Sequence, residues 1–177
     1  MATIIDEIPG LYKIYRLDPL RKTPGVVFDT FPMDGITHID AVDRVLHDHS
    51  AVSPGPVGSV ERPWYMHLHQ DDNLLVLAGT RFVEIYTPEH GKIENFTVTS
   101  NSVHKNGKLI YEGGAVLVWP RYVFHRIVSG AEGSSSINLA AHYEGLDPEN
   151  NFSIYDVNTE TGEYRIIRKG IEDQKNL

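Results

Sequence analysis

The chain has 177 residues, a formal net charge of -8 from 16 Lys and Arg against 24 Asp and Glu, and no cysteine. Its length fits a single domain with one hydrophobic core, and the lack of thiols excludes disulfides and thiolate metal sites. The acidic balance, without any basic run, argues against nucleic acid and an anionic membrane surface as partners.

Residues 1–60 are predicted to form an N-terminal arm rich in Pro and Gly. Its start holds acidic residues and no long apolar stretch, so we expect no signal peptide, no membrane span and a cytoplasmic protein. One short helix is predicted near residues 37–49, because helical periodicity would align four apolar side chains, namely Ile39, Val42, Val45 and Leu46. His47 and His49 would then lie at the helix end, where positive charge is favourable.

Residues 62–145 are predicted to form the core of a barrel, since short β-like runs alternate with Gly, Pro, Asn and Asp turns. Residues 146–170 are expected to form a C-terminal hairpin. The runs 74–78 and 115–119 are apolar at every position, so both faces of these strands should be covered. We expect the arm or a second subunit to cover them and favour a homodimer paired through sheet faces, with a monomeric sandwich as the alternative.

The run WYMHLH contains the main candidates for chemistry. In a strand, Tyr65, His67 and His69 share one face, opposite three apolar residues. Side chains two residues apart stand about 7 Å apart at the backbone, so both imidazoles can reach one ion. The alternative is that both histidines are exposed, or are buried and bonded to backbone carbonyls.

Two segments, HLHQDDNLLVLAG and GAVLVWPRYVFH, resemble the two motifs of the cupin superfamily over residues 64–143. Six positions agree with the motif spacings: His67, His69, Gly79, Gly114, Pro120 and His125. Three positions depart. Asp72 lies one residue too near His69 to replace the usual Glu, while Tyr122 and Ser129 replace a Gly and an Asn.

The resemblance implies one all-β cupin domain over residues 1–177, a double-stranded β-helix or jelly-roll barrel. It also implies a metal held by His67, His69, His125 and Asp72, with Gln70 or Asn73 as the alternative to Asp72. A nitrogen-rich site of this kind suits one divalent transition ion, and Fe, Mn, Ni, Co and Zn are not distinguished.

Other residues are candidates for substrate handling. Tyr65 and His142 are catalytic candidates, while Arg81, Arg126 and Asn138 are candidates for binding a small-molecule substrate. Each of these side chains also has an ordinary structural explanation, such as core packing or a salt bridge.

The leading hypothesis is a metal-dependent isomerase, lyase or oxygenase acting on a sugar derivative or oxo acid. A fainter resemblance favours the metal-free sugar-nucleotide epimerases and isomerases, with His67 or His69 as base, Tyr65 or Tyr86 as acid, and arginines binding diphosphate. A third hypothesis is a barrel that binds a small ligand without catalysis.

Overall fold

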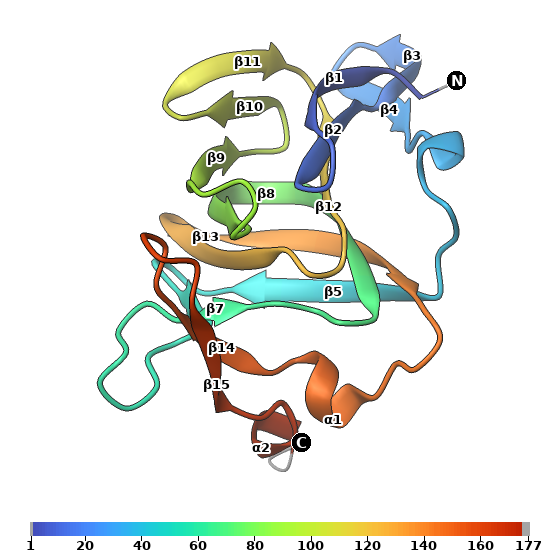
Figure 1. Cartoon of the computed structure of the whole chain (residues 1–177). Coiled ribbons are helices and arrows are strands. Elements are labelled where there is room, and N and C mark those ends of the chain that lie inside the picture. Colours follow the sequence, from blue (N-terminus) through green and yellow to red (C-terminus); the bar gives the residue numbers. More distant parts are fainter. Residues whose placement is uncertain (1, 175–177) are drawn as a thin grey trace.

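The computed structural model describes residues 2–174, and most of their regular structure is β-strand (Figure 1). The main antiparallel sheet of these residues has thirteen strands: β1 (Ile4–Ile8), β2 (Tyr12–Arg16), β5 (Ala41–His47), β6 (Val52–Ser53), β7 (Trp64–Tyr65), β8 (Gln70–Tyr86), β9 (Glu94–Val98), β10 (Ser102–Lys105), β11 (Lys108–Glu112), β12 (Ala115–Trp119), β13 (Phe124–His142), β14 (Ile154–Val157) and β15 (Tyr164–Arg168). A separate hairpin and three short helical segments complete the regular structure: β3 (Asp18–Thr23), β4 (Val26–Thr30), the 3-10 helix η1 (Met33–Gly35), α1 (Pro148–Asn151) and α2 (Ile171–Gln174). The expectation of an all-β chain is confirmed.

The two longest strands, β8 and β13, pair with each other along most of their length. Strands β2, β9 and β12 extend the sheet beyond this pair on the β8 side, whereas β5, β6 and β7 pair with the other edge of β13. The β8–β13 ladder changes register near Ser134, where strands bend. Gly79 allows this approach, because its φ is +70° and a Cβ there would lie 2.0 Å from the carbonyl oxygen of Gly133.

The interior contains two apolar clusters. The larger is built from β2, β8, β9 and β12, with Ile14 and Leu117 fully buried, and the smaller packs Trp64 against Tyr86 and Phe124. Each fully buried side chain of this size stabilises the fold by about 1.5–3 kcal/mol. Several polar side chains, among them His67, Asp72, Arg81 and His125, are buried as well, so part of the interior is polar.

The predicted helix at residues 37–49 is wrong, because residues 41–47 form strand β5. All seven residues of β5 pair with β13, and these tertiary hydrogen bonds override a pattern that also fits a helix. Alternate side chains Asp43, Val45 and His47 line an interior cavity. Val42 and Leu46, assigned to the buried helix stripe, are 64% and 59% exposed.

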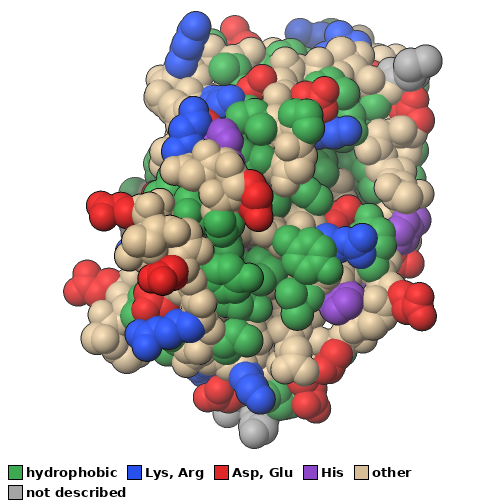
Figure 2. Space-filling model, viewed as in Figure 1, with side chains coloured by type: hydrophobic (Ala, Val, Ile, Leu, Met, Phe, Trp, Pro, Cys, Tyr) green, Lys and Arg blue, Asp and Glu red, His purple; other side chains and the backbone are tan. Residues whose placement is uncertain are grey.

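The two wholly apolar runs have different surroundings. Within Ala115–Trp119 four of five residues are buried and Val118 is half-buried, so this chain alone covers both faces of β12. In the other run Leu77 remains 50% exposed. Hydrophobic side chains gather near the middle of the face drawn in Figure 2, with most charged side chains toward its margins. None of the helices in residues 2–174 has the length and apolar character needed to cross a membrane.

Candidate active site

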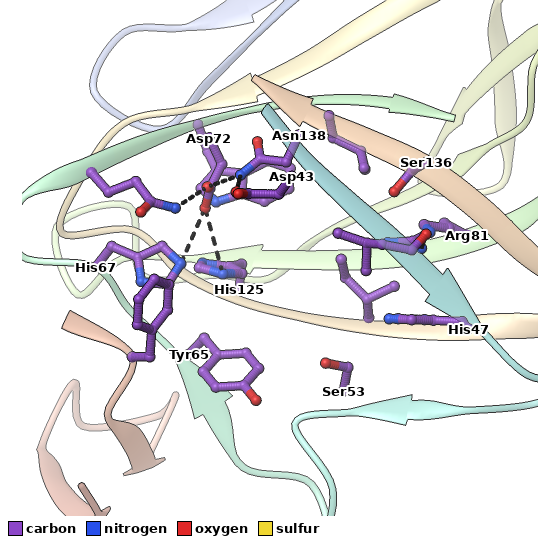
Figure 3. A pocket seen from close by; sticks show the side chains of 16 residues that line it. Asp43, His47, Ser53, Tyr65, His67, Asp72, Arg81, His125, Ser136 and Asn138 are labelled. Atoms are coloured by element: carbon purple, nitrogen blue, oxygen red, sulfur yellow. Dashed lines mark hydrogen bonds and ion pairs between the residues drawn. The ribbon is translucent and has the colours of Figure 1, made fainter. Parts of the chain in front are cut away.

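A cavity of about 190 Å³ opens inside the barrel, lined by side chains from β5, β6, β7, β8, β12 and β13 together with His67 and Phe152 (Figure 3). A neighbouring hollow of about 360 Å³ shares Tyr65, His67 and Phe152 with it and reaches α2. The cavity therefore lies at the polar part of the interior and adjoins a second space at one end.

Three buried side chains converge in the cavity. The Asp72 Oδ2 atom lies 3.3 Å from His67 Nε2 and 3.8 Å from His125 Nε2. The ligand atoms of all three lie within 4.8 Å of one another, and this is the group in the described residues with a geometry that could hold a metal ion. The structure thus brings together three of the four predicted metal ligands.

Backbone carbonyls hold both imidazoles in place. His67 Nδ1 donates to Asn151 O at 2.7 Å, and His125 Nδ1 pairs with Val123 O at 3.1 Å. With Nδ1 protonated in both rings, both Nε2 atoms face the Asp72 carboxylate. The other oxygen of that carboxylate accepts from the side-chain amides of Gln70 and Asn138, each at 2.7 Å.

Burial and neighbouring charges shift the pKa values of the two histidines in opposite directions. Burial disfavours the charged ring of His67, but the charge and hydrogen bond of Asp72 outweigh it, so the pKa of His67 is raised. Burial and then the charge of His67 lower the pKa of His125 to about 4. Burial would raise the pKa of Asp72, yet His67 and His125 hold it below its ordinary value.

The structure does not bring His69 to this group. Strand pairing is interrupted at residues 66–69, between β7 and β8, and the alternation of side chains shifts by one residue there. Tyr65 and His67 line the cavity before the interruption, whereas Gln70 and Asp72 line it afterwards. The ring of His69 instead packs near Gly145, outside the cavity. The same shift turns Asp72 inward despite its unusual spacing.

The remaining predicted residues divide into two sets. Tyr65, Asn138 and Arg81 line the cavity, as a substrate-contacting role requires. Arg126 does not, because its Nε lies 2.5 Å from Glu84 Oε2 and its guanidinium lies 4.0 Å from the Trp64 ring. His142 does not line it either, and its backbone makes two hydrogen bonds outside the cavity lining.

His142 N donates to Asp40 at 2.7 Å, and His142 O accepts from His38 at 2.8 Å. Tyr86, the alternative acid, is part of the Trp64 cluster and also lies outside the cavity. These two residues therefore lack the access that a catalytic role would need in this structure.

Sequence reasoning missed several lining residues, above all Asp43, His47 and Ser136. Two of them lie on β5, where the alternation Asp43, Val45, His47 was a usable signal for a strand with a polar inner face. The assumption of a helix concealed it. Nothing in the sequence around Ser136 distinguishes it from its neighbours Ser134 and Ser135.

Neither protein-family models nor curated proteins match the sequence. Solved structures do match. The sugar 3,4-ketoisomerase QdtA from Thermoanaerobacterium thermosaccharolyticum, in complex with TDP, aligns over 77% of this chain and 82% of its own, at 13% identity and a TM-score of 0.55.

Two epimerases also match. The 4-keto-6-deoxy sugar epimerase NovW from Streptomyces spheroides gives 12% identity and a TM-score of 0.60 over 84% of this chain and 71% of its own. The epimerase RmlC from Legionella pneumophila, in complex with dTDP-4-keto-L-rhamnose, gives 15% identity and a TM-score of 0.58 over 94% of this chain and 85% of its own.

The chain therefore has the cupin fold, the double-stranded β-helix that the two motifs predicted. Within that class, the structures it resembles are ketoisomerases and epimerases of sugars. At these identities the likeness establishes the fold, while substrate and reaction have to be argued from the cavity itself.

Proposed function

We propose that this chain is an isomerase or epimerase that moves protons on a keto sugar, with His67 and His125 exchanging the protons. The observation that carries the proposal is the pair of buried histidines whose Nε2 atoms both face one oxygen of the Asp72 carboxylate, with the three ligand atoms within 4.8 Å of one another. The pKa values of the two histidines are displaced in opposite directions. His67 therefore holds its proton to a higher pH than His125 does, which is the division that acid and base catalysis needs.

Each histidine then has a defined role. His125 takes a proton from the carbon beside the substrate carbonyl, and protonated His67 delivers a proton to the carbonyl oxygen, giving an enediol. Delivery of a proton to the former carbonyl carbon, with loss of the proton from the neighbouring hydroxyl, gives the isomer. Delivery of a proton from Tyr65 to the other face of the first carbon, with return of the enediol proton to His67, gives the epimer. Asp72 stabilises the cationic form of His67 throughout.

Tyr65 is a positioned proton donor in this scheme. Its ring centre lies 6.4 Å from that of His67 and 6.0 Å from that of His125. Burial, with a smaller effect from Asp173, raises the pKa of Tyr65, so the phenol keeps its proton near neutral pH. The hydroxyl is therefore available as a hydrogen-bond donor to a sugar oxygen.

The similar structures support the substrate class. QdtA has been solved with TDP and with TDP-4-keto-6-deoxyglucose, and RmlC with dTDP-4-keto-L-rhamnose. A cavity of about 190 Å³ suits a single sugar unit, and the adjoining hollow of about 360 Å³ offers space for a linked group.

The test is solvent proton exchange. The protein is incubated in heavy water with TDP-4-keto-6-deoxyglucose and with unlinked keto sugars, and deuterium at the carbons beside the carbonyl is followed by NMR. We expect exchange with the wild type, its loss in folded His67→Asn and His125→Asn, and its retention in the exposed control His49→Asn. No exchange with any keto sugar, or undiminished exchange in both cavity variants, would contradict the proposal.

A metal-dependent enzyme is the second candidate, favoured by the carbonyl hydrogen bonds that aim both Nε2 atoms at Asp72 Oδ2. Two imidazoles and one carboxylate form a donor set that binds Fe, Mn, Co, Ni or Zn. When bound, such an ion would polarise a substrate carbonyl. Elemental analysis before and after chelation decides between the candidates, because exchange abolished by chelation supports the metal and unchanged exchange supports the metal-free reaction.

We also propose that the protein is a homodimer in solution. Supporting this, the outward side chains Val42, Leu46 and Leu77 are 64%, 59% and 50% exposed on neighbouring parts of the sheet. Exposed apolar side chains grouped in this way are typical of an interaction surface. A second copy of this chain is the partner that two-fold symmetry favours.

A further inference from the structure

A second polar group lies in the same cavity, on the side away from His67 (Figure 3). It consists of Arg81 from β8, Ser136 from β13 and His47 from β5. The acid and base scheme uses none of the three. One of them, Arg81, is a deeply buried cation, and burying a charge is costly unless a partner compensates it.

Arg81 is 1% exposed, yet only two hydrogen bonds hold its guanidinium, from Nε to Ser134 Oγ at 3.1 Å and from Nη2 to Val45 O at 3.2 Å. A guanidinium has five N–H donors, so three make no hydrogen bond with residues 2–174. No Asp or Glu in that range forms an ion pair with it, and burial alone lowers its pKa, to about 10. Arg81 therefore remains charged and without a counter-ion, which is costly in the interior.

Three other polar atoms of the cavity lining are also unpaired. Ser136 Oγ, His47 Nδ1 and Trp119 Nε1 are buried and have no hydrogen-bond partner in the described chain, and all three residues line this cavity. Burial, and next the charge of Arg81, lower the pKa of His47 to about 4, so His47 is neutral near pH 7. A hydroxyl, an indole N–H and a neutral imidazole can each donate one hydrogen bond.

We infer that Arg81, His47 and Ser136 bind a carboxylate of the substrate, so that the substrate is a keto sugar acid or a related oxo acid. This inference rests on the proposed function and names its substrate class. A guanidinium pairs with a planar carboxylate through two parallel hydrogen bonds, and such pairs are stronger than neutral ones. The bound carboxylate supplies the counter-ion that the described residues do not.

The spacing along β5 supports one molecule reaching both ends of the cavity. Arg81 contacts β5 at Val45, two residues from Asp43. Asp43 and Asp72 both accept from the Asn138 amide, at 3.3 and 2.7 Å. Two residues of a strand cover about 7 Å, which a single sugar unit can span. A carboxylate at Arg81 therefore leaves the other end of the same molecule beside the histidines.

The test is titration calorimetry with D-glucuronate, its uncharged counterpart D-glucose, and inorganic phosphate. We expect D-glucuronate to bind wild-type protein at least about tenfold more tightly than D-glucose, as a charge-assisted pair implies. Arg81→Met should remove this preference and Arg81→Lys, which keeps the charge without the planar fork, should retain part of it. Arg44→Met is the matched control, because Arg44 is exposed on β5 and does not line the cavity.

If circular dichroism shows that Arg81→Met does not fold, Ser136→Ala serves as the second variant. Ser136 Oγ makes no hydrogen bond within the described chain, so we expect its loss to leave the fold intact. That variant should bind D-glucuronate several-fold more weakly. Equal binding of D-glucuronate and D-glucose, or tighter binding of phosphate than of D-glucuronate, would overturn the inference. Proton exchange without a preference for D-glucuronate overturns this inference alone, whereas the preference without exchange on any keto compound overturns the proposed function alone.

Discussion

Acid should destabilise the protein through His125. Its side chain is almost wholly buried, and its pKa is about 4 in the folded chain against 6.5 when exposed. Between these values the unfolded state binds more protons, so the stability due to neutral His125 is present above about pH 6.5 and is lost as the pH falls toward 4. Integrating the two titrations from about pH 7 to about pH 4.5 gives a loss of about 2 kcal/mol.

The assay is urea denaturation of chelator-dialysed protein, followed by tryptophan fluorescence at both pH values. Wild type should lose about 2 kcal/mol more of its free energy of unfolding on acidification than His125→Gln does. The exposed control His49→Gln should behave like wild type. Equal losses in wild type and His125→Gln would refute the reasoning, because the neutral buried ring would then contribute nothing to the pH dependence.

Three further outcomes are expected. Gly79→Ala should lower the free energy of unfolding by more than about 1 kcal/mol in thermal melts, since the φ of Gly79 is +70° and a Cβ would lie 2.0 Å from a facing carbonyl oxygen. Gly107→Ala is the control, because its φ of +79° is similar but the space around it is open. An equal cost for the two substitutions would contradict this prediction. Leu46→Lys should convert the proposed dimer to a monomer in light scattering, because it places a charge among exposed apolar side chains, and a monomeric wild type would exclude the dimer. Asp72→Asn should lower the pKa of His67 in an NMR titration, because its carboxylate partner is gone, and an unchanged pKa would show that Asp72 does not set it.

The motifs predicted the fold well because they mark positions that the barrel requires. Gly79 lies where the backbone of β8 meets that of β13, and only glycine fits there. His125 lies on β13 facing the cavity, at the spacing that the second motif predicts. These constraints are local, so they can be recognised from sequence.

The inward set of side chains was harder to predict. Alternation correctly paired Tyr65 with His67, but it cannot show that the strand is interrupted before Gln70. That interruption removes His69 from the site and turns Asp72 into it. It depends on contacts distant in sequence, such as the hydrogen bond that the backbone N–H of His69 donates to Asn151 Oδ1 at 3.0 Å.

The sequence did not predict strand β5, for a related reason. The segment AVDRVLH satisfies a helical stripe and a strand alternation almost equally. Its pairing with β13, whose partner residues lie between 87 (His47 with Ser134) and 99 (Ala41 with Ala140) positions away along the chain, decides between them. Local propensity carries no information about that partner.

Strand β5 also affects how a ligand could enter. It supplies Asp43, Val45 and His47 to the cavity wall, but within residues 2–174 it pairs with another strand along one edge only, that of β13. A wall secured along a single edge can open locally without unfolding the rest of the barrel. Its outer amides should exchange with solvent faster than those of β8 and β13, and an occupied cavity should slow that exchange. Entry of the substrate would then require the same local opening of β5 that amide exchange reports.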